Sequence, residues 1–231
     1  MVSKVKKAVK VLFVLFLGFL VSGCTKSDAV KFKEEYESLN GKTSSNGKEY
    51  RKLEISEDNP FVYLSTKELL EKIDNQETFL VYFGYASCLW CRNVIGPLIS
   101  ASKDNDVSKI YYIDLYEIRD ILKVEDGKII TEREGTKDYK EILKKLDNLL
   151  EEYTLTNGEE EIKTGEKRIY APSVVSIVKG KGTKLTLGIS KLQTDPYMEL
   201  SGEMIEEYYN SFVEIIKEIN NSDLCEIGSK C

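Results

Sequence analysis

The chain has 231 residues, of which 33 are basic and 39 acidic, giving a formal charge of −6. Its length suits one domain with insertions or a tail. The acidic charge opposes binding to nucleic acid, so no nucleic-acid partner is expected. The chain contains no histidine, which excludes Ser-His-Asp and Cys-His catalysis and the usual histidine-bearing zinc and copper sites.

The first 23 residues predict an export signal. Four lysines precede an apolar run over residues 11–21, which is too short for a comfortable membrane span. The run ends at Val21-Ser22-Gly23-Cys24, which resembles the bacterial lipobox, whose cysteine is lipidated and becomes the first residue after cleavage. The resemblance implies a lipid on Cys24 that anchors the chain at the extracytoplasmic face of the bacterial plasma membrane. An uncleaved signal anchor is the alternative.

Removing this signal takes away four lysines and no acidic residue, which leaves a formal charge of about −10. Residues 24–50 are polar and rich in Ser, Lys, Glu and Gly, and this composition predicts a flexible, lipidated tether. The folded domain is expected over residues 51–221. It begins with a strand over 61–64 and a helix over 66–73, which starts with a capping box of Ser and Glu.

The segment from residue 79 to residue 91 carries the strongest functional signal. Residues 79–83 are apolar throughout, as in a central strand covered on both faces. Cys88 and Cys91 follow, three residues apart, where that strand gives way to a helix. A cysteine there faces unpaired N–H groups and the positive end of the helix dipole, which lower its pKa below that of a free thiol. The spacing therefore predicts a nucleophilic Cys88 and a resolving Cys91.

The second half of the chain alternates further elements. They are expected to be a strand over 110–115, a helix with apolar residues from Tyr139 to Tyr153, strands over 173–178 and 184–189, and a long helix that begins after Ser201 and carries apolar residues from Met204 to Ile219. The stretch between Cys91 and Pro172 is longer than these elements require. The surplus is assigned to residues 124–137 and 154–168, which are polar, glycine-punctuated and hairpin-like. They either shape a substrate surface or are loops without a role.

This order of elements predicts an α/β fold with a mixed central sheet and helices on both faces. Together with Cys88-Leu89-Trp90-Cys91 at the strand-to-helix turn and Pro172 opening a later strand, it resembles the thioredoxin superfamily over about residues 61–220. The resemblance implies a thioredoxin-like three-layer fold with insertions. It also implies that Cys88 is an exposed nucleophile and that the bond before Pro172 is cis and packs against the cysteine pair.

Further site residues follow from the same resemblance. It implies that substrate contacts Leu89, Trp90, Ala171 and Pro172. The sequence departs from the family pattern at Tyr82, where the family often carries a buried acid that assists the resolving thiol. Arg92, next to Cys91, is interpreted as a solvated side chain of the first helical turn.

The remaining two cysteines, Cys225 and Cys231, lie in an expected C-terminal tail over residues 222–231. They form either a local disulfide or a redox relay. A structural zinc site built from both cysteine pairs is an alternative, although its spacing is unusual. A permanently oxidised, inert Cys88–Cys91 bridge in a binding protein is another.

These observations predict an extracytoplasmic thiol-disulfide oxidoreductase that works through a mixed disulfide and requires no metal or organic cofactor. Its expected partners are exported proteins with thiols or disulfides, and a membrane electron donor is a further candidate. The alternative is a non-catalytic accessory lipoprotein that binds exported peptides or a transporter. The direction of electron flow is not fixed by the sequence.

Overall fold

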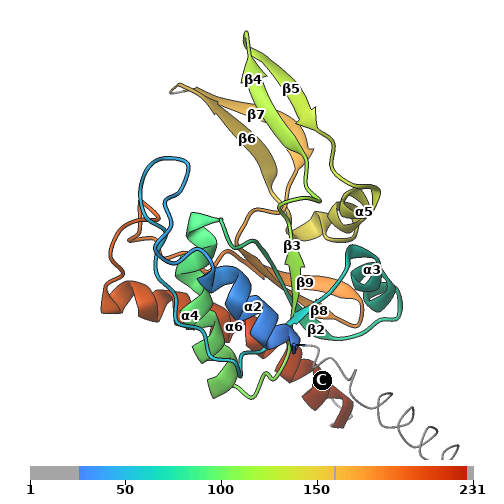
Figure 1. Ribbon diagram of the computed structural model, residues 1–231. Coiled ribbons are helices and arrows are strands. Elements are labelled where there is room, and N and C mark those ends of the chain that lie inside the picture. Colours follow the sequence, from blue (N-terminus) through green and yellow to red (C-terminus); the bar gives the residue numbers. More distant parts are fainter. Residues whose placement is uncertain (1–25, 159, 228–231) are drawn as a thin grey trace, which may run out of the picture.

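The computed structural model describes residues 26–158 and 160–227, without the side chains of Asn157 and of residues 222–227. Its centre is a five-stranded sheet with the strand order β1-β3-β2-β8-β9 (Figure 1). Strands β1, β3 and β2 are mutually parallel, whereas β8 runs antiparallel to β2 and to β9. The sheet is therefore mixed, and the α/β fold expected from the sequence is confirmed.

The elements of this body have the following bounds: α2 Asp28–Glu37, β1 Phe61–Tyr63, α3 Thr66–Asp74, β2 Phe79–Gly84, α4 Leu89–Asp104, β3 Ile110–Asp114, α5 Lys137–Lys145, β8 Ser173–Val178, β9 Lys181–Thr186 and α6 Gly202–Ile227. Strand β9 begins and ends three residues earlier than expected, because the β8–β9 turn takes only Lys179 and Gly180, both with positive φ.

Helices cover both faces of the sheet (Figure 1). Helices α2, α4 and α6 share one hydrophobic cluster with Leu80 and Tyr82 of β2. Helices α3 and α5 share the other with Val81 and Phe83. Alternate β2 side chains thus point into opposite cores, which explains why this strand is apolar throughout.

Two helix starts follow the predicted capping chemistry. The Ser65 hydroxyl accepts the Glu68 N–H at 3.2 Å, and the Glu68 carboxylate accepts the Ser65 N–H at 2.9 Å, which completes the capping box of α3. At α6 the Ser201 hydroxyl accepts the N–H of Met204 at 3.2 Å. These predictions are confirmed because a cap depends on residues within one turn of it.

Two inserted hairpins stand outside the central sheet and project from the body (Figure 1). The first consists of β4 (Ile121–Glu125) and β5 (Lys128–Arg133), and the second of β6 (Glu152–Asn157) and β7 (Glu160–Lys167). Both hairpins were expected from their polar, glycine-punctuated sequences. Compared with the expected segments 124–137 and 154–168, the first hairpin begins three residues earlier and ends four residues earlier, and the second begins two residues earlier and ends one residue earlier.

The long helix expected from Tyr139 to Tyr153 is wrong in its second half. Helix α5 ends at Lys145, a 3-10 turn covers Asp147–Leu149, and Tyr153 lies on strand β6. The apolar spacing continues past the helix because Leu146 and Leu150 still pack into the core from the turn. Periodicity alone does not distinguish these two conformations.

The flexible tether expected over residues 24–50 is also wrong for its described part. Residues 28–37 form helix α2, which starts at the N-cap Ser27. Phe32 and Tyr36 of α2 are fully buried, and the Phe32 ring stacks on Phe61 with centroids 3.9 Å apart. These two aromatic residues, one helical turn apart, give α2 a buried face despite its polar composition. The domain therefore begins before residue 51.

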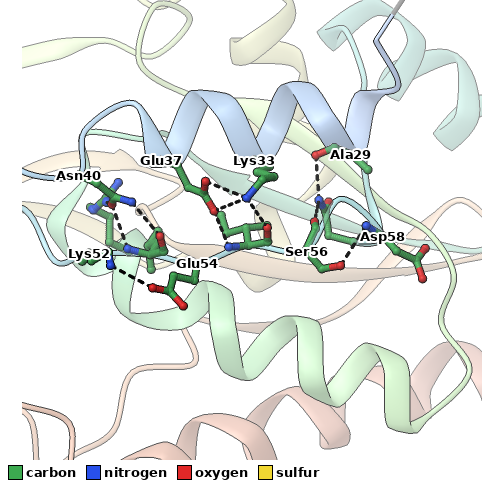
Figure 2. A network of polar contacts seen from close by, with 12 residues as sticks. Ala29, Lys33, Glu37, Asn40, Lys52, Glu54, Ser56 and Asp58 are labelled. Atoms are coloured by element: carbon green, nitrogen blue, oxygen red, sulfur yellow. Dashed lines mark hydrogen bonds and ion pairs between the residues drawn. The ribbon is translucent and has the colours of Figure 1, made fainter.

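Polar contacts fasten α2 to the following chain (Figure 2). Lys33 donates to the Glu37 carboxylate and to the Ile55 carbonyl, each at 2.8 Å. Glu37 accepts the Ile55 N–H at 2.6 Å, and Asn40 bonds both backbone groups of Leu53. Backbone groups that a sheet would otherwise pair are thus satisfied by side chains of the helical segment.

Several expectations fall at the ends of the chain. Helix α6 runs to Ile227, so its backbone includes Cys225 and the expected tail boundary at 222 is too early. The export signal, the apolar run over residues 11–21 and Cys24 lie outside the described residues, as do Cys231 and the Cys225 side chain. Within residues 26–158 and 160–227, no helix is long and apolar enough to cross a membrane.

Candidate active site

Cys88 lies at the N-cap of α4, directly after the turn that leaves β2. Its Sγ accepts the backbone N–H of Cys91 at 3.2 Å. The turn is closed by the Cys88 N–H, which donates to the Tyr85 carbonyl at 3.1 Å. The sulfur therefore occupies the place that a serine or aspartate oxygen takes in an ordinary N-cap, where N–H groups favour a negative charge.

The Ala171–Pro172 segment lies against the same sulfur. The Cys88 thiol donates to the Ala171 carbonyl at 3.4 Å, and the bond between Ala171 and Pro172 is cis. Strand β8 begins at Ser173, which pairs with Phe83 of β2. The adjacent antiparallel strands thus bring Ala171 to Cys88, although 82 residues separate them in the sequence.

The two cysteines differ in burial and in acidity. Cys88 keeps 7% of its surface exposed and Cys91 keeps none, so the exposed sulfur expected at Cys88 is largely covered. Burial raises the pKa of Cys88, but hydrogen bonds with Cys91 and Trp90 and the charge of Arg119 lower it, and the net shift is downward. Burial and the neighbouring Cys88 raise the pKa of Cys91 well above its usual value.

Two buried tyrosines, Tyr82 and Tyr36, lie close to Cys91. The Tyr82 hydroxyl lowers the pKa of Cys91, against the larger effect of burial. The same hydroxyl lies 3.1 Å from the Tyr36 hydroxyl of α2. Burial raises the pKa of both phenols well above its usual range, so they act as neutral hydrogen-bond partners. The sequence placed Tyr82 here but gave no sign of Tyr36.

Gly84 makes room for this arrangement. A Cβ atom at this position would lie 2.3 Å from the Tyr82 hydroxyl oxygen. Gly84 is two residues beyond Tyr82 on β2, so both face the same side of the sheet. Glycine at 84 therefore lets the Tyr82 ring extend along the strand to the cysteine pair.

Arg119 is a site residue that the sequence analysis missed. Its Nη2 donates to the Tyr85 hydroxyl at 2.9 Å, and its guanidinium carbon lies 5.0 Å from the centre of the Tyr85 ring. Strands β2 and β3 are parallel, with Gly84 paired to Asp114, so the residues after them emerge at one edge. Basic residues after the second strand were therefore candidates for a position beside Cys88.

Arg92 is not the solvated side chain expected from the sequence. It is 1% exposed and donates to the Tyr36 carbonyl at 2.7 Å, the Arg51 carbonyl at 2.6 Å and the Asn40 side chain at 2.9 Å. The guanidinium is buried because α2 and residues 40–51 fold over α4 and supply acceptors. Arg92 thus fixes the N-terminal segment, and with it Tyr36, to the helix that carries Cys91.

The other predicted site residues flank the sulfur. Leu89 and Trp90 are half-buried in the first turn of α4, and Trp90 packs against the core. Ala171 is half-buried and Pro172 is buried. In the described part of the chain, no three His, Cys, Asp or Glu side chains gather as a metal centre requires. The alternative zinc site includes Cys225 and Cys231, whose side chains are outside that part.

The arrangement can support thiol chemistry, because a covered acidic sulfur lies beside a buried, less acidic one within a single helical turn. A scan against models of known protein families finds no match for this chain, and a search of curated protein sequences finds no relative. Function is therefore inferred from the cysteine site itself.

Proposed function

We propose that this protein is a thiol-disulfide oxidoreductase with a thioredoxin-like fold. The observation that carries the proposal is the position of Cys88 Sγ, which lies 3.2 Å from the Cys91 N–H and 3.4 Å from the carbonyl oxygen of Ala171. The first contact favours a thiolate. The second sets a backbone segment beside the sulfur, where an extended substrate peptide could pair with it.

The proposed reaction has two exchange steps. The Cys88 thiolate attacks a substrate disulfide, a Cys88–substrate disulfide forms, and the first substrate sulfur leaves and takes up a proton. Cys91 then gives up its proton and attacks Cys88. The Cys88–Cys91 disulfide forms, the second substrate sulfur leaves as a thiol, and two electrons have passed to the substrate. The reverse sequence oxidises a dithiol.

The cellular setting is part of the proposal. A lipid on Cys24 would hold the domain at the outer face of the plasma membrane, where its substrates would be exported proteins with thiols or disulfides. Reduction of such substrates requires an electron source, for which a membrane dithiol donor is proposed. The acidic chain, with its formal charge of −6, supports protein substrates over nucleic acid.

The roles of the two cysteines are tested by trapping. The Cys91→Ser variant lacks the resolving thiol, so it should accumulate mixed disulfides with substrate proteins. Both variants are made with Cys225→Ser and Cys231→Ser, and the matched Cys88→Ser variant should then accumulate none, because Cys91 is fully buried. Non-reducing electrophoresis detects the adducts. Equal trapping by the two variants would contradict the assignment.

Catalysis itself is tested by reduction of insulin with dithiothreitol as the electron source. The full-length protein in detergent should accelerate the reaction, and Cys88→Ser should abolish the acceleration. Silence of the wild type across a range of redox buffers would instead support a non-catalytic accessory lipoprotein that binds exported peptides or a transporter.

A further inference from the structure

Arg119 lies on a short loop between β3 and β4, which we define as the Arg119 loop, residues 115–120. The loop emerges beside the cysteine turn because β3 is parallel to β2. Arg119 is half-buried and reaches Tyr85, whose hydroxyl it contacts at 2.9 Å. Tyr85 in turn accepts the Cys88 N–H through its carbonyl at 3.1 Å. One tyrosine therefore joins the guanidinium to the turn that carries Cys88.

Inserted residues hold the backbone of this loop. The Arg133 guanidinium, at the end of β5, donates to the Arg119 carbonyl at 3.1 Å and also to the Tyr116 carbonyl. The N–H of Thr136 donates to the Ile118 carbonyl at 2.8 Å. Consecutive parts of the loop are thus fixed from the first insertion.

The second insertion supplies the last of these contacts. Arg168, which follows β7, donates to the Asp120 carbonyl at 2.5 Å, and its guanidinium carbon lies 4.1 Å from the centre of the Tyr153 ring on β6. Residues at the bases of both hairpins therefore meet on one loop. This convergence gives the insertions a structural role beside the cysteine pair.

Arg119 brings a positive charge to the turn that carries Cys88. Among the residues that the structure describes, no carboxylate forms an ion pair with Arg119; Asp114 is coupled to it more weakly. The groups that most affect Cys88 are Cys91, Trp90 and Arg119, and the phenols of Tyr36, Tyr82 and Tyr85 are also coupled to it. Among the groups named here that interact with Cys88, only Arg119 carries a charge at pH 7.

We propose that Arg119 sets the fraction of Cys88 present as thiolate, and that Arg133 and Arg168, at the bases of the two inserted hairpins, are positioning residues that hold Arg119 beside the cysteine pair. The inference rests on the proposed function, because a tuned thiolate matters where Cys88 attacks a disulfide. If the proposal is correct, the two inserted hairpins are part of the candidate site rather than surface loops without a role.

The test is the rate of Cys88 alkylation by iodoacetamide as a function of pH, measured on the reduced full-length protein by peptide mass spectrometry. Arg119→Met should slow the reaction at pH 7 by about threefold to tenfold, as expected for loss of one nearby charge. The rates should converge at high pH, where Cys88 is a thiolate in both proteins. Arg119→Lys retains the charge and should keep most of the reactivity at pH 7.

Two variants in the first hairpin distinguish the positioning of Arg119 from the mere loss of a positive charge. Arg133→Met should shift the pH profile in the same direction as Arg119→Met but by less. This variant removes the hydrogen bonds that hold the Arg119 loop, whereas the Arg119 charge itself remains. Lys128→Met is the matched control: it removes one positive charge from an exposed position on the same strand and should leave the profile unchanged.

A folded Arg119→Met protein with the wild-type profile would overturn the inference. If that variant does not fold, the wild-type protein provides a second test. Its Cys88 alkylation rate at pH 7 should fall as the salt concentration rises from 0.05 to 1 M, roughly the range over which a half-exposed charge is screened. A rate that does not depend on salt would contradict the role of Arg119. Alkylation needs no turnover. An Arg119-dependent profile in a protein that does not reduce insulin would therefore refute the proposed function alone.

Discussion

Cys88 and Cys91 are three residues apart, yet their different surroundings shift the pKa values of their thiols in opposite directions. Cys88 caps a helix and faces N–H groups, so its lowered pKa leaves thiolate present at a pH where a free cysteine is mostly protonated. Its reactivity should rise with pH through that lowered value and then level off. Cys91 has a raised pKa, so it should stay unmodified in the same pH range.

Tyr82 is the residue whose substitution tests the second step. Tyr82→Phe keeps the ring but removes the hydroxyl that lowers the pKa of Cys91. The Cys91 thiol should then lose its proton less readily, and the mixed disulfide should persist about tenfold longer, as expected for loss of one hydrogen bond to a charged group. Stopped-flow measurement of mixed-disulfide decay tests this.

Tyr36→Phe is the matched control for that experiment. It removes the other hydroxyl of the same buried pair, which lies 3.1 Å from that of Tyr82. Both variants should lose about 1–3 kcal/mol of unfolding free energy, because each leaves one buried hydroxyl without its partner. Only Tyr82→Phe should slow the decay strongly. Equal slowing in both would mean that the hydroxyls act through stability rather than on Cys91.

At the scale of helices and strands, α2 is the element that the sequence misrepresents. Its mean composition is polar, and composition predicted a tether. Phe32 and Tyr36 decide otherwise, because each is fully buried and Phe32 stacks on Phe61. Two aromatic residues among the ten of α2 gave only a weak periodic signal. Their burial depends on a surface formed by strands that are distant in the sequence.

Phe32→Ala measures how firmly α2 is attached. Truncating a fully buried phenylalanine should lower the free energy of unfolding by about 3–5 kcal/mol, measured by urea denaturation. Lys31→Ala, on the exposed side of the same helix, should change it by less than about 0.5 kcal/mol. An unchanged midpoint for Phe32→Ala would restore the tether interpretation.

The sequence predicted those elements whose determinants are local. The cap at Ser65, the all-apolar strand β2 and the hairpin turns each depend on neighbouring residues, and the structure contains all of them. Positions set by distant contacts were harder to predict. The acceptors that bury Arg92 come from Tyr36, Asn40 and Arg51, and no local pattern announces that these segments meet.

The candidate site shows the same division. Cys88, Cys91, Ala171 and Tyr82 were predictable because a motif or strand position marks each of them. Arg119 was harder to identify: the parallel pairing of β2 with β3 made basic residues after β3 candidates, but which of them reaches Tyr85 depends on the fold. Strand order is a property of the fold, and only the fold brings those residues together.

At the scale of the whole molecule, the two inserted hairpins, β4–β5 and β6–β7, project as an arm from the body formed by the central sheet and its helices (Figure 1). Every residue of β2 is buried, whereas β4 and β5 are half-buried or exposed. The arm should therefore open without unfolding the body. In native-state hydrogen exchange, amides of β2 should exchange only through global unfolding, and those of β4 and β5 much faster. Equal protection would show that the arm and the body unfold as one unit.

The central claim is that Cys88 and Cys91 form a redox-active pair. Its most direct test is the reduction potential of that pair, measured by equilibration in thiol–disulfide buffers in the full-length protein with Cys225→Ser and Cys231→Ser to isolate it. A redox-active pair should have a potential between about −120 and −270 mV, the range of catalytic dithiols. A potential below about −300 mV, typical of structural disulfides, would contradict the claim.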